Sequence, residues 1–374
     1  MKMKRYILLL LMLFETFQKS DVYFTKEITS EKIVEMFKKL NVKLEGKVGL
    51  KVHSGEKDGP YFLRPNFLEK IYEYTKGTFI ECNTAYDGYR NSTKAHKELL
   101  GWNGWTKYNT VIMDEDDGNF TLKVEKPNNI SVNYVGSKLK DFDSCLVLAH
   151  FKGHPMGGFG GAMKQLSIGF ASTAGKSYIH SGGYTLDYNE CWDTHEAEQL
   201  DFTAAMADAA STIVKYFKDR GGIAYINVLV NISEICDCGG ILAPPPKIRD
   251  IGILASTDPI AIDKACYDLI VKENTSGSKD WVNQSERLLG LNTLVVGEKI
   301  GLGSLEYNLI DVDEEDKEDK EDLWYVWYLI LPIGILIIIT IIALIIYFYK
   351  KKGKKEKTEG ETDDFGEAMI SKAE

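Results

Sequence analysis

The side chains best suited to chemistry gather between residues 150 and 181. This segment, HFKGHPMGGFGGAMKQLSIGFASTAGKSYIHS, holds seven glycines, three lysines and three of the six histidines of the chain. The histidines are His150, His154 and His180. A histidine beside a glycine-rich loop can bind a metal ion or act as a general base. The segment therefore predicts a metal- or cofactor-binding site.

Glycines in this loop could bring the backbone close to a ligand, and consecutive N–H groups can bind an anion. Lys164 follows the loop in the first turns of an expected helix, where it could reach a phosphate. Neither G-x-G-x-x-G nor G-x-x-x-x-G-K-[ST] is matched in full, which argues against a dinucleotide-binding fold or a P-loop. Arg90 could hold a carboxylate or phosphate through two hydrogen bonds. The expected ligand is small and anionic, and the predicted cofactor-binding residues are Gly157, Gly158, Gly160, Gly161, Lys164 and Arg90.

Apolar runs of strand length alternate with helical patterns, which predicts an α/β fold with a mostly parallel sheet flanked by helices. The expected strands are Lys47–His53, Gly77–Cys82, Asp143–His150, Ala224–Ile232 and Ile251–Ser256. The expected helices are Pro65–Thr75, Ser92–Leu100, Asp201–Lys218 and Thr257–Lys272. Sites in such sheets form beyond the carboxyl ends of strands. That rule selects four loops, Asn83–Thr93, His150–Lys164, Ile232–Pro246 and Ser256–Pro259.

The six cysteines leave their pairing open, because six thiols allow fifteen pairings. Cys236 and Cys238 flank Asp237 just after an expected strand. Thiolates suit zinc, copper(I) or an iron–sulfur cluster. No third or fourth cysteine stands at metal-ligand spacing, so a redox or structural role ranks ahead of metal binding for this pair.

The charge of the chain is concentrated near its C-terminus. The formal net charge is −10, and residues 311–322 (DVDEEDKEDKED) hold nine acids and two lysines. An acidic chain does not bind nucleic acid through bulk positive charge. We interpret residues 311–323 as an acidic stalk, 324–349 as one C-terminal transmembrane helix, and 350–374 as a basic, then polar, cytoplasmic tail.

The N-terminus fits the same topology. Three basic residues precede a short apolar run, so residues 1–20 are predicted to be a signal peptide. Six N-x-S/T sequons lie between the two apolar segments and suggest a glycoprotein. The prediction is a single-pass type I membrane protein of the secretory pathway or cell surface. Residues 21–310 would form its lumenal or extracellular domain, with the membrane as a partner and protein partners unknown.

Four long motifs carry a family resemblance: ECNTAYDGYRNSTKAH, the segment from 150 to 181, YINVLVNISEICDC and DIGILASTDPIAIDKACYDLI. Over residues 45–300 the chain resembles the domain of unknown function 362 family. Many members of that family carry a ferredoxin-type insert just after the position of His180. Here the segment Ser181–Leu200 contains only Cys191, so an iron–sulfur cluster is not expected.

The family is in turn distantly similar to the N-terminal domain of nickel-pincer lactate racemase. His154, Lys164 and His180 have the spacing of a histidine, lysine and histidine in that enzyme. The resemblance implies that His154 is a catalytic base, that Lys164 carries a nucleotide-derived cofactor, and that His180 binds the metal. His150, at the end of its strand, is the other predicted metal ligand.

A second catalytic histidine of the racemase has no counterpart here. The comparable stretch, DGYRNST, offers Tyr89, which we take as the residue standing in its place. Racemisation needs two bases, so lactate racemase activity is not expected. Two functions remain open: a metal- or cofactor-dependent enzyme, and a non-catalytic, membrane-tethered binding or surface protein.

Overall fold

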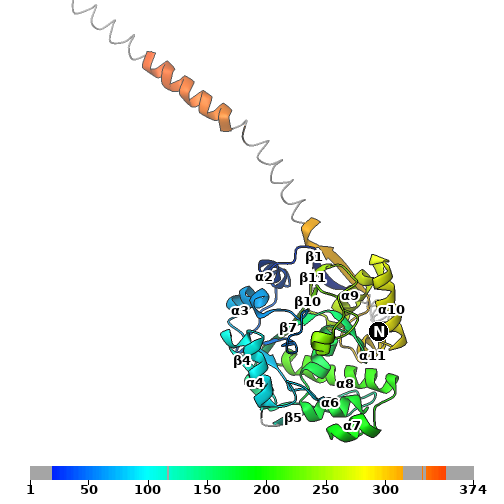
Figure 1. The fold of residues 1–374 in the computed structure, drawn as a ribbon. Helices are drawn as coiled ribbons and strands as arrows, with labels where there is room; N and C mark the ends of the chain where they lie inside the picture. The colour runs from blue at the N-terminus through cyan, green and yellow to red at the C-terminus, as the bar shows by residue number, and fades with distance from the viewer. Residues whose placement is uncertain (1–18, 116–117, 315–330, 332–333, 351–374) are drawn as a thin grey trace, which may run out of the picture. The chain divides into compact units, whose positions relative to one another are not determined.

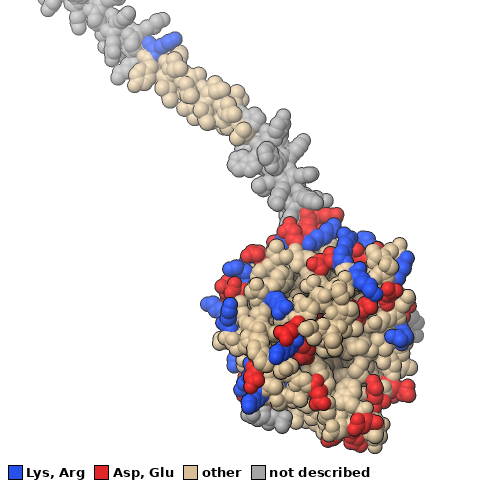
Figure 2. All heavy atoms as spheres, viewed as in Figure 1, with Lys and Arg blue, Asp and Glu red and all other residues tan. Residues whose placement is uncertain are grey.

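The structure is a computed structural model that describes residues 19–115, 118–314, 331 and 334–350. The chain divides into two compact units at Val312. The first unit contains the sheets and nearly all of the described helices (Figure 1). Lys, Arg, Asp and Glu are interspersed over the face of this unit seen in Figure 2.

An eight-stranded sheet runs through the first unit in the order β12-β1-β11-β10-β7-β2-β3-β4. Five of its seven neighbouring pairs are parallel, and β11 is antiparallel to both of its neighbours. The strands are β1 (Ser20–Thr25), β2 (Val48–Lys51), β3 (Thr78–Glu81), β4 (Thr110–Ile112), β7 (Ser144–His150), β10 (Ile223–Leu229), β11 (Gly252–Ser256) and β12 (Tyr307–Asp311). Two small antiparallel pairs are β5 (Asn119–Lys123) with β6 (Val132–Gly136) and β8 (Lys152–His154) with β9 (Gly158–Gly160).

Helices cover both faces of the sheet. They are α2 (Ser30–Lys39), α3 (Glu69–Thr75), α4 (Thr93–Trp102), α5 (Ala162–Lys164), α6 (Thr173–His180), α7 (Tyr188–Thr194), α8 (Gln199–Lys218), α9 (Pro259–Glu273), α10 (Ser276–Arg287) and α11 (Asn292–Lys299). A hydrophobic core lies on each face of the sheet, and neighbouring residues of β7 belong to different cores. Val147 packs in the core with α8 and α9, whereas Leu148 packs in the core with α2 and α3. Successive side chains of β7 thus point to opposite faces of the sheet, and all of them are buried, because helices cover both faces.

The predicted α/β class, with a mostly parallel sheet flanked by helices, is confirmed. Each expected strand and helix has a counterpart that overlaps it. Asp258 caps α9 by accepting hydrogen bonds from the amides of Ile260 and Ala261, which fixes the start of that helix. β1 and β12 were not predicted. Ser20, which we expected to end a signal peptide, is instead the first residue of β1 and pairs with Tyr307.

The prediction of a single-pass type I membrane protein is contradicted. No helix in the described part of the chain is both long and apolar enough to cross a bilayer. The lumenal placement and the glycosylation of the sequons depended on that topology and lose their support with it.

Parts of these predictions lie outside the described residues: 1–18 of the signal peptide, 315–323 of the stalk, most of 324–333, and 351–374 of the tail. Two described residues of the predicted stalk belong to the folded unit instead. Asp311 ends β12, and Val312 is fully buried in the core beside α2 and α3.

Candidate functional site

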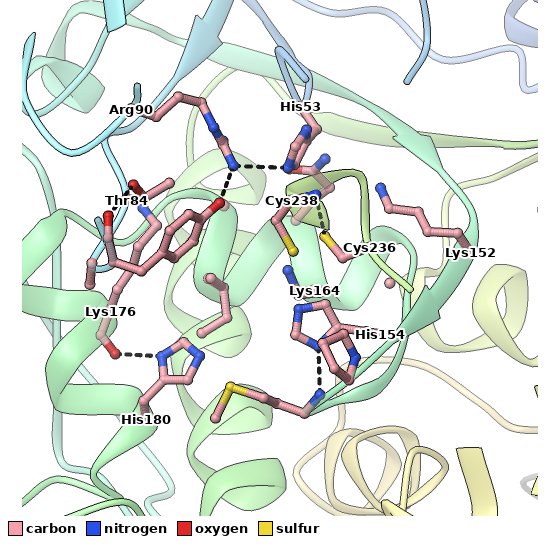
Figure 3. A pocket seen from close by; sticks show the side chains of 18 of the residues that line it. His53, Thr84, Arg90, Lys152, His154, Lys164, Lys176, His180, Cys236 and Cys238 are labelled. Carbon is pink, nitrogen blue, oxygen red and sulfur yellow. Dashed lines mark hydrogen bonds between the residues drawn. The ribbon is translucent and has the colours of Figure 1, made fainter. Parts of the chain in front are cut away.

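One cavity lies beyond the carboxyl ends of β2, β3, β7 and β10, and its volume is about 850 Å³ including the open solvent at its mouth. Three of the four predicted loops contribute to its lining, and Ser256–Pro259 does not. Figure 3 shows histidine, lysine and cysteine side chains converging on it. The lining includes His150, His154, Gly160, Gly161, Lys164, His180 and Arg90 from the predicted site, together with His53, Lys152, Lys176, Cys236 and Cys238.

The glycine-rich loop positions the site more than it binds a ligand. Ala162 and Met163 begin α5, and their amides donate to the two carboxylate oxygens of Asp263 at 2.8 and 2.9 Å. Those two N–H groups are therefore not available as the expected anion cradle. Gly158 has a φ of +76°, and a Cβ there would lie 2.6 Å from the Cα of Gly290. It thus holds the β8–β9 hairpin against the segment after α10.

Gly157, Gly158 and Tyr89 are not among the residues that line the cavity. The side chain of Tyr89 is 43% exposed and meets the ring of Trp102 edge-on. The ammonium group of Lys57 lies over both rings. The catalytic role predicted for Tyr89 therefore does not fit its position on the surface.

Asp237 joins the buried side chains of His150 and Lys152. One of its oxygens lies 2.9 Å from Nδ1 of His150 and 2.8 Å from Nζ of Lys152. Nε2 of His150 is 2.6 Å from the carbonyl oxygen of Val230. Both ring nitrogens of His150 thus face hydrogen-bond acceptors, and neither is free to bind the metal that we assigned to this residue. The neighbouring charge of His150 and Lys152 overcomes the effect of burial and holds the pKa of Asp237 well below its usual range.

Cys236 and Cys238 lie on either side of Asp237 and meet His154. One donor atom from each of these three residues lies within 4.8 Å of the others. Nδ1 of His154 accepts hydrogen bonds from the amides of Met156 and Gly157 at 3.2 and 2.9 Å, so Nε2 is the nitrogen left to meet the sulfurs. Burial, and then the charge of Lys164, lowers the pKa of His154 to about 4.

The two thiols differ in their charge state. The hydrogen bond from Cys238 and the nearby charge of Lys164 lower the pKa of Cys236 well below that of a free thiol, and hydrogen bonds from His154 and His53 add to the effect. The same bond raises the pKa of Cys238. A lowered pKa favours the thiolate of Cys236, which is the form of a cysteine that binds metals.

His180 lines the cavity but is not part of this group. Its Nδ1 lies 2.8 Å from the carbonyl oxygen of Lys176, and its ring stacks on Phe202 at 4.9 Å. Burial lowers its pKa to about 3, so the ring is neutral. Its second nitrogen, Nε2, has a lone pair that could accept a proton or meet a ligand.

The buried neutral imidazoles predict a loss of stability in mild acid. His96 lies between the side chains of Ser54 and Asn83, and burial lowers its pKa to about 3, as for His180. Between about pH 3 and 6.5 the unfolded chain protonates these rings while the folded chain does not, so folding weakens as the pH falls. From pH 7 to 5 each ring should cost about 2 kcal/mol, measured by urea unfolding.

The control for this expectation is His96→Gln, which lacks the titrating ring but keeps hydrogen-bonding groups. Its stability should fall less between pH 7 and 5 than that of the unchanged chain. An equal fall in both proteins would contradict the burial of a neutral ring at this position.

The contact of His154 with the cysteine pair was not predicted from the sequence. Cys236 and Cys238 do lie in one of the four loops expected beyond strand ends, and this position pointed to the site. Arg90 was expected to be free for an anion. In the structure its guanidinium group contacts Glu56, His53 and the hydroxyl of Tyr86.

Comparison with known proteins identifies the chain by family. Residues 48–268 match the model of the domain of unknown function DUF362. Among curated proteins no match is found. Solved structures that resemble this one include the lactate racemase apoprotein from Thermoanaerobacterium thermosaccharolyticum, with 11% identity and a TM-score of 0.37 over 66% of this chain and 57% of that one.

A second similar structure is that of a structural-genomics protein from Thermotoga maritima, with 16% identity and a TM-score of 0.36 over 72% of this chain and 59% of that one. The chain thus spans less than two thirds of the length of either protein. Similarity at this level does not transfer an activity. The family model, in contrast, covers more than half of the chain, including β2, β7, β10 and the whole cavity-forming segment from His150 to His180, and the chain belongs to the DUF362 family.

Proposed function

We propose that this chain binds a thiophilic metal ion through Cys236, Cys238 and His154, on the wall of a cavity that also takes a small anionic molecule. The observation that supports the metal most directly is the convergence of three donor atoms within 4.8 Å. Two sulfurs and an imidazole are a ligand set that suits zinc or copper(I). Three protein ligands would leave a coordination position open toward the cavity.

The chemistry of the donors fits such an ion. The lowered pKa of Cys236 favours its thiolate, and the lowered pKa of His154 favours the neutral ring. Two backbone amides donate hydrogen bonds to Nδ1 of His154 and so fix the orientation of its ring. The ion would take the place of the hydrogen on Cys238, so binding should release a proton and weaken in acid. When bound, the metal would polarise an oxygen of a molecule in the cavity.

The cavity also supports an anionic ligand. The ammonium group of Lys164 has neither an ion pair nor a hydrogen bond with any described residue, although its charge influences His154, His180 and Cys236. An unpaired ammonium group beside an open metal position would attract a carboxylate or phosphate. The covalent attachment of a nucleotide-derived cofactor to Lys164, which the racemase resemblance implies, stays a prediction, as do catalysis and its substrate.

Metal analysis of the purified chain tests this function. The unchanged protein should hold about one zinc or copper ion per chain after loading and desalting. Cys236→Ser should reduce the content to less than about a tenth of that value, because a hydroxyl group is a poor ligand for a soft metal. Measurement is by atomic emission on samples whose folding is checked by circular dichroism.

Two controls sharpen the result. Cys145→Ala removes a thiol that is buried in β7 away from the cavity and should keep the metal. His180→Gln separates the proposed ligand set from the one implied by the resemblance, and it should also keep the metal. Loss of metal in His180→Gln with retention in Cys236→Ser would overturn the assignment.

A further inference from the structure

Lys176 differs from the other buried cations at the cavity because it has no carboxylate partner. Arg90 is paired with Glu56, and Lys152 is paired with Asp237. Within the described part of the chain, no carboxylate lies within ion-pair distance of Lys176. Its ammonium nitrogen instead donates to the carbonyl oxygen of Ala171 at 2.5 Å. A buried charge without a partner is costly, which favours the neutral amine.

The position of Lys176 places this amine at the cavity. The residue belongs to α6 and is 6% exposed, and it lines the same cavity as Lys164 and His180. Figure 3 shows Lys176 and His180 together on one side of the cavity, where they are joined by the hydrogen bond from His180 to the Lys176 backbone. Because α6 is fixed to β6 by the backbone contact between Ser172 and Tyr134, the amine is held on a rigid element.

Burial also favours the neutral amine. It lowers the pKa of Lys176 despite the opposing effects of Cys82, Asp114 and Glu81, and the nearby ammonium group of Lys51 adds a smaller lowering. Burial and a second cation are the two features that activate lysines as nucleophiles. A neutral amine can donate one hydrogen to Ala171 and keep its lone pair for a ligand.

We propose that Lys176 is a nucleophilic amine that forms an imine with a small oxo acid. Its nitrogen adds to the carbonyl carbon of the ligand, and the carbonyl oxygen then leaves as water with the two hydrogens of the amine. The C=O bond is replaced by a C=N bond, and no oxidant or reductant takes part. The acid group of the ligand is recognised by the unpaired Lys164 in the same cavity. The proposal shares the anionic ligand with the proposed function but needs no metal.

Reductive trapping tests the imine. The full chain is incubated with pyruvate and reduced with borohydride, and the modified lysines are mapped by peptide mass spectrometry. Lys176 should carry the carboxyethyl group at least about tenfold more often than any other lysine, as expected for an activated amine. Acetone, which lacks the acid group, should label Lys176 about tenfold less, because it gains nothing from Lys164.

Variants confirm the position. Lys176→Arg should abolish the selective label, whereas Lys97→Arg, on the surface of α4, should keep it. Since Lys176→Arg could disturb folding, the peptide map of the unchanged protein decides the question by itself. Labelling spread over exposed lysines, labelling of Lys164 alone, or no labelling would each overturn the proposal. Trapping is run with and without metal: a protein that binds metal but shows no Lys176 label rejects the imine and leaves the metal centre standing.

Discussion

Asp237→Ala should lower the free energy of unfolding by about 3–5 kcal/mol, the typical cost of removing one partner from a buried ion pair. Its carboxylate is 1% exposed and lies between His150 and Lys152, whose side chains are 1% and 4% exposed. Without it, two buried cations lose their shared anion and cannot reach water. Guanidinium unfolding at pH 7, followed by circular dichroism, measures the loss.

The matched control is an ion pair at the surface. Lys215 and Asp219 lie 2.8 Å apart on the last turn of α8, and both are more than half exposed. Asp219→Ala should barely change the unfolding midpoint, because water already solvates both charges. Similar midpoints for Asp237→Ala and Asp219→Ala would mean that Asp237 does not hold the two cations in place.

The pH dependence of Asp237 has a definite sign. Its folded pKa is depressed, so its contribution to stability is present above the unfolded value of about 3.8 and is lost as the pH falls through the folded value. The titration of this carboxylate itself should therefore add no pH dependence between pH 7 and 5 to the difference between Asp237→Ala and the unchanged protein. The loss predicted for the buried imidazoles in that range belongs to other residues and should appear in both proteins.

The fold could be predicted from sequence because its central elements carry strong local signals. β7 and β10 are continuous apolar runs, and α8 has a long helical pattern. The outer strands β1 and β12 lack such signals. Both are short, β12 has no fully buried residue, and the two strands pair across 287 positions of sequence at Asp21 and Asn308. That pairing depends on the completed fold, which no local pattern reports.

The site was predicted in part. The rule that sites form beyond the carboxyl ends of strands identified the loops that carry His154 and Cys236, because parallel strands bring these ends to the same edge of the sheet. It did not show that His154, rather than His180, would meet the sulfurs. That outcome depends on the β8–β9 hairpin, which folds His154 back over the loop after β10. Side-chain pairing also reassigned Arg90 and His150, whose partners come from distant parts of the chain.

The C-terminal segment shows the limit of composition as a guide. Residues 324–349 are apolar and free of charged side chains, and hydropathy alone predicted a membrane span. Among the described residues, no helix is both long and apolar enough to cross a bilayer.

Gly153→Ala should separate the loop that carries His154 from the loop that carries Cys236. A Cβ at Gly153 would lie 2.2 Å from the carbonyl oxygen of Glu234 and 2.6 Å from its carbonyl carbon, so backbone blocks the added methyl group. The amide of Gly153 also donates to the carbonyl oxygen of Ser233 at 2.8 Å, which fastens the loop of His154 to the loop of Cys236. The methyl group must push these loops apart, at a cost of about 3 kcal/mol.

The separation should reach the metal ligands, because His154 follows Gly153 directly and Cys236 lies two residues after Glu234. We expect zinc affinity to fall at least about tenfold, since a ligand moved by a fraction of an ångström no longer completes the site. Competition with a chromogenic chelator measures the affinity, and urea unfolding measures the stability. Gly101→Ala is the control, because Gly101 lies within α4, where alanine is favoured, and its added Cβ would be 3.9 Å from the side chain of Thr106. It should keep its metal and gain slightly in stability. If Gly153→Ala lost stability but kept full zinc affinity, the contact between the loops would hold the fold together without positioning His154 against the sulfurs.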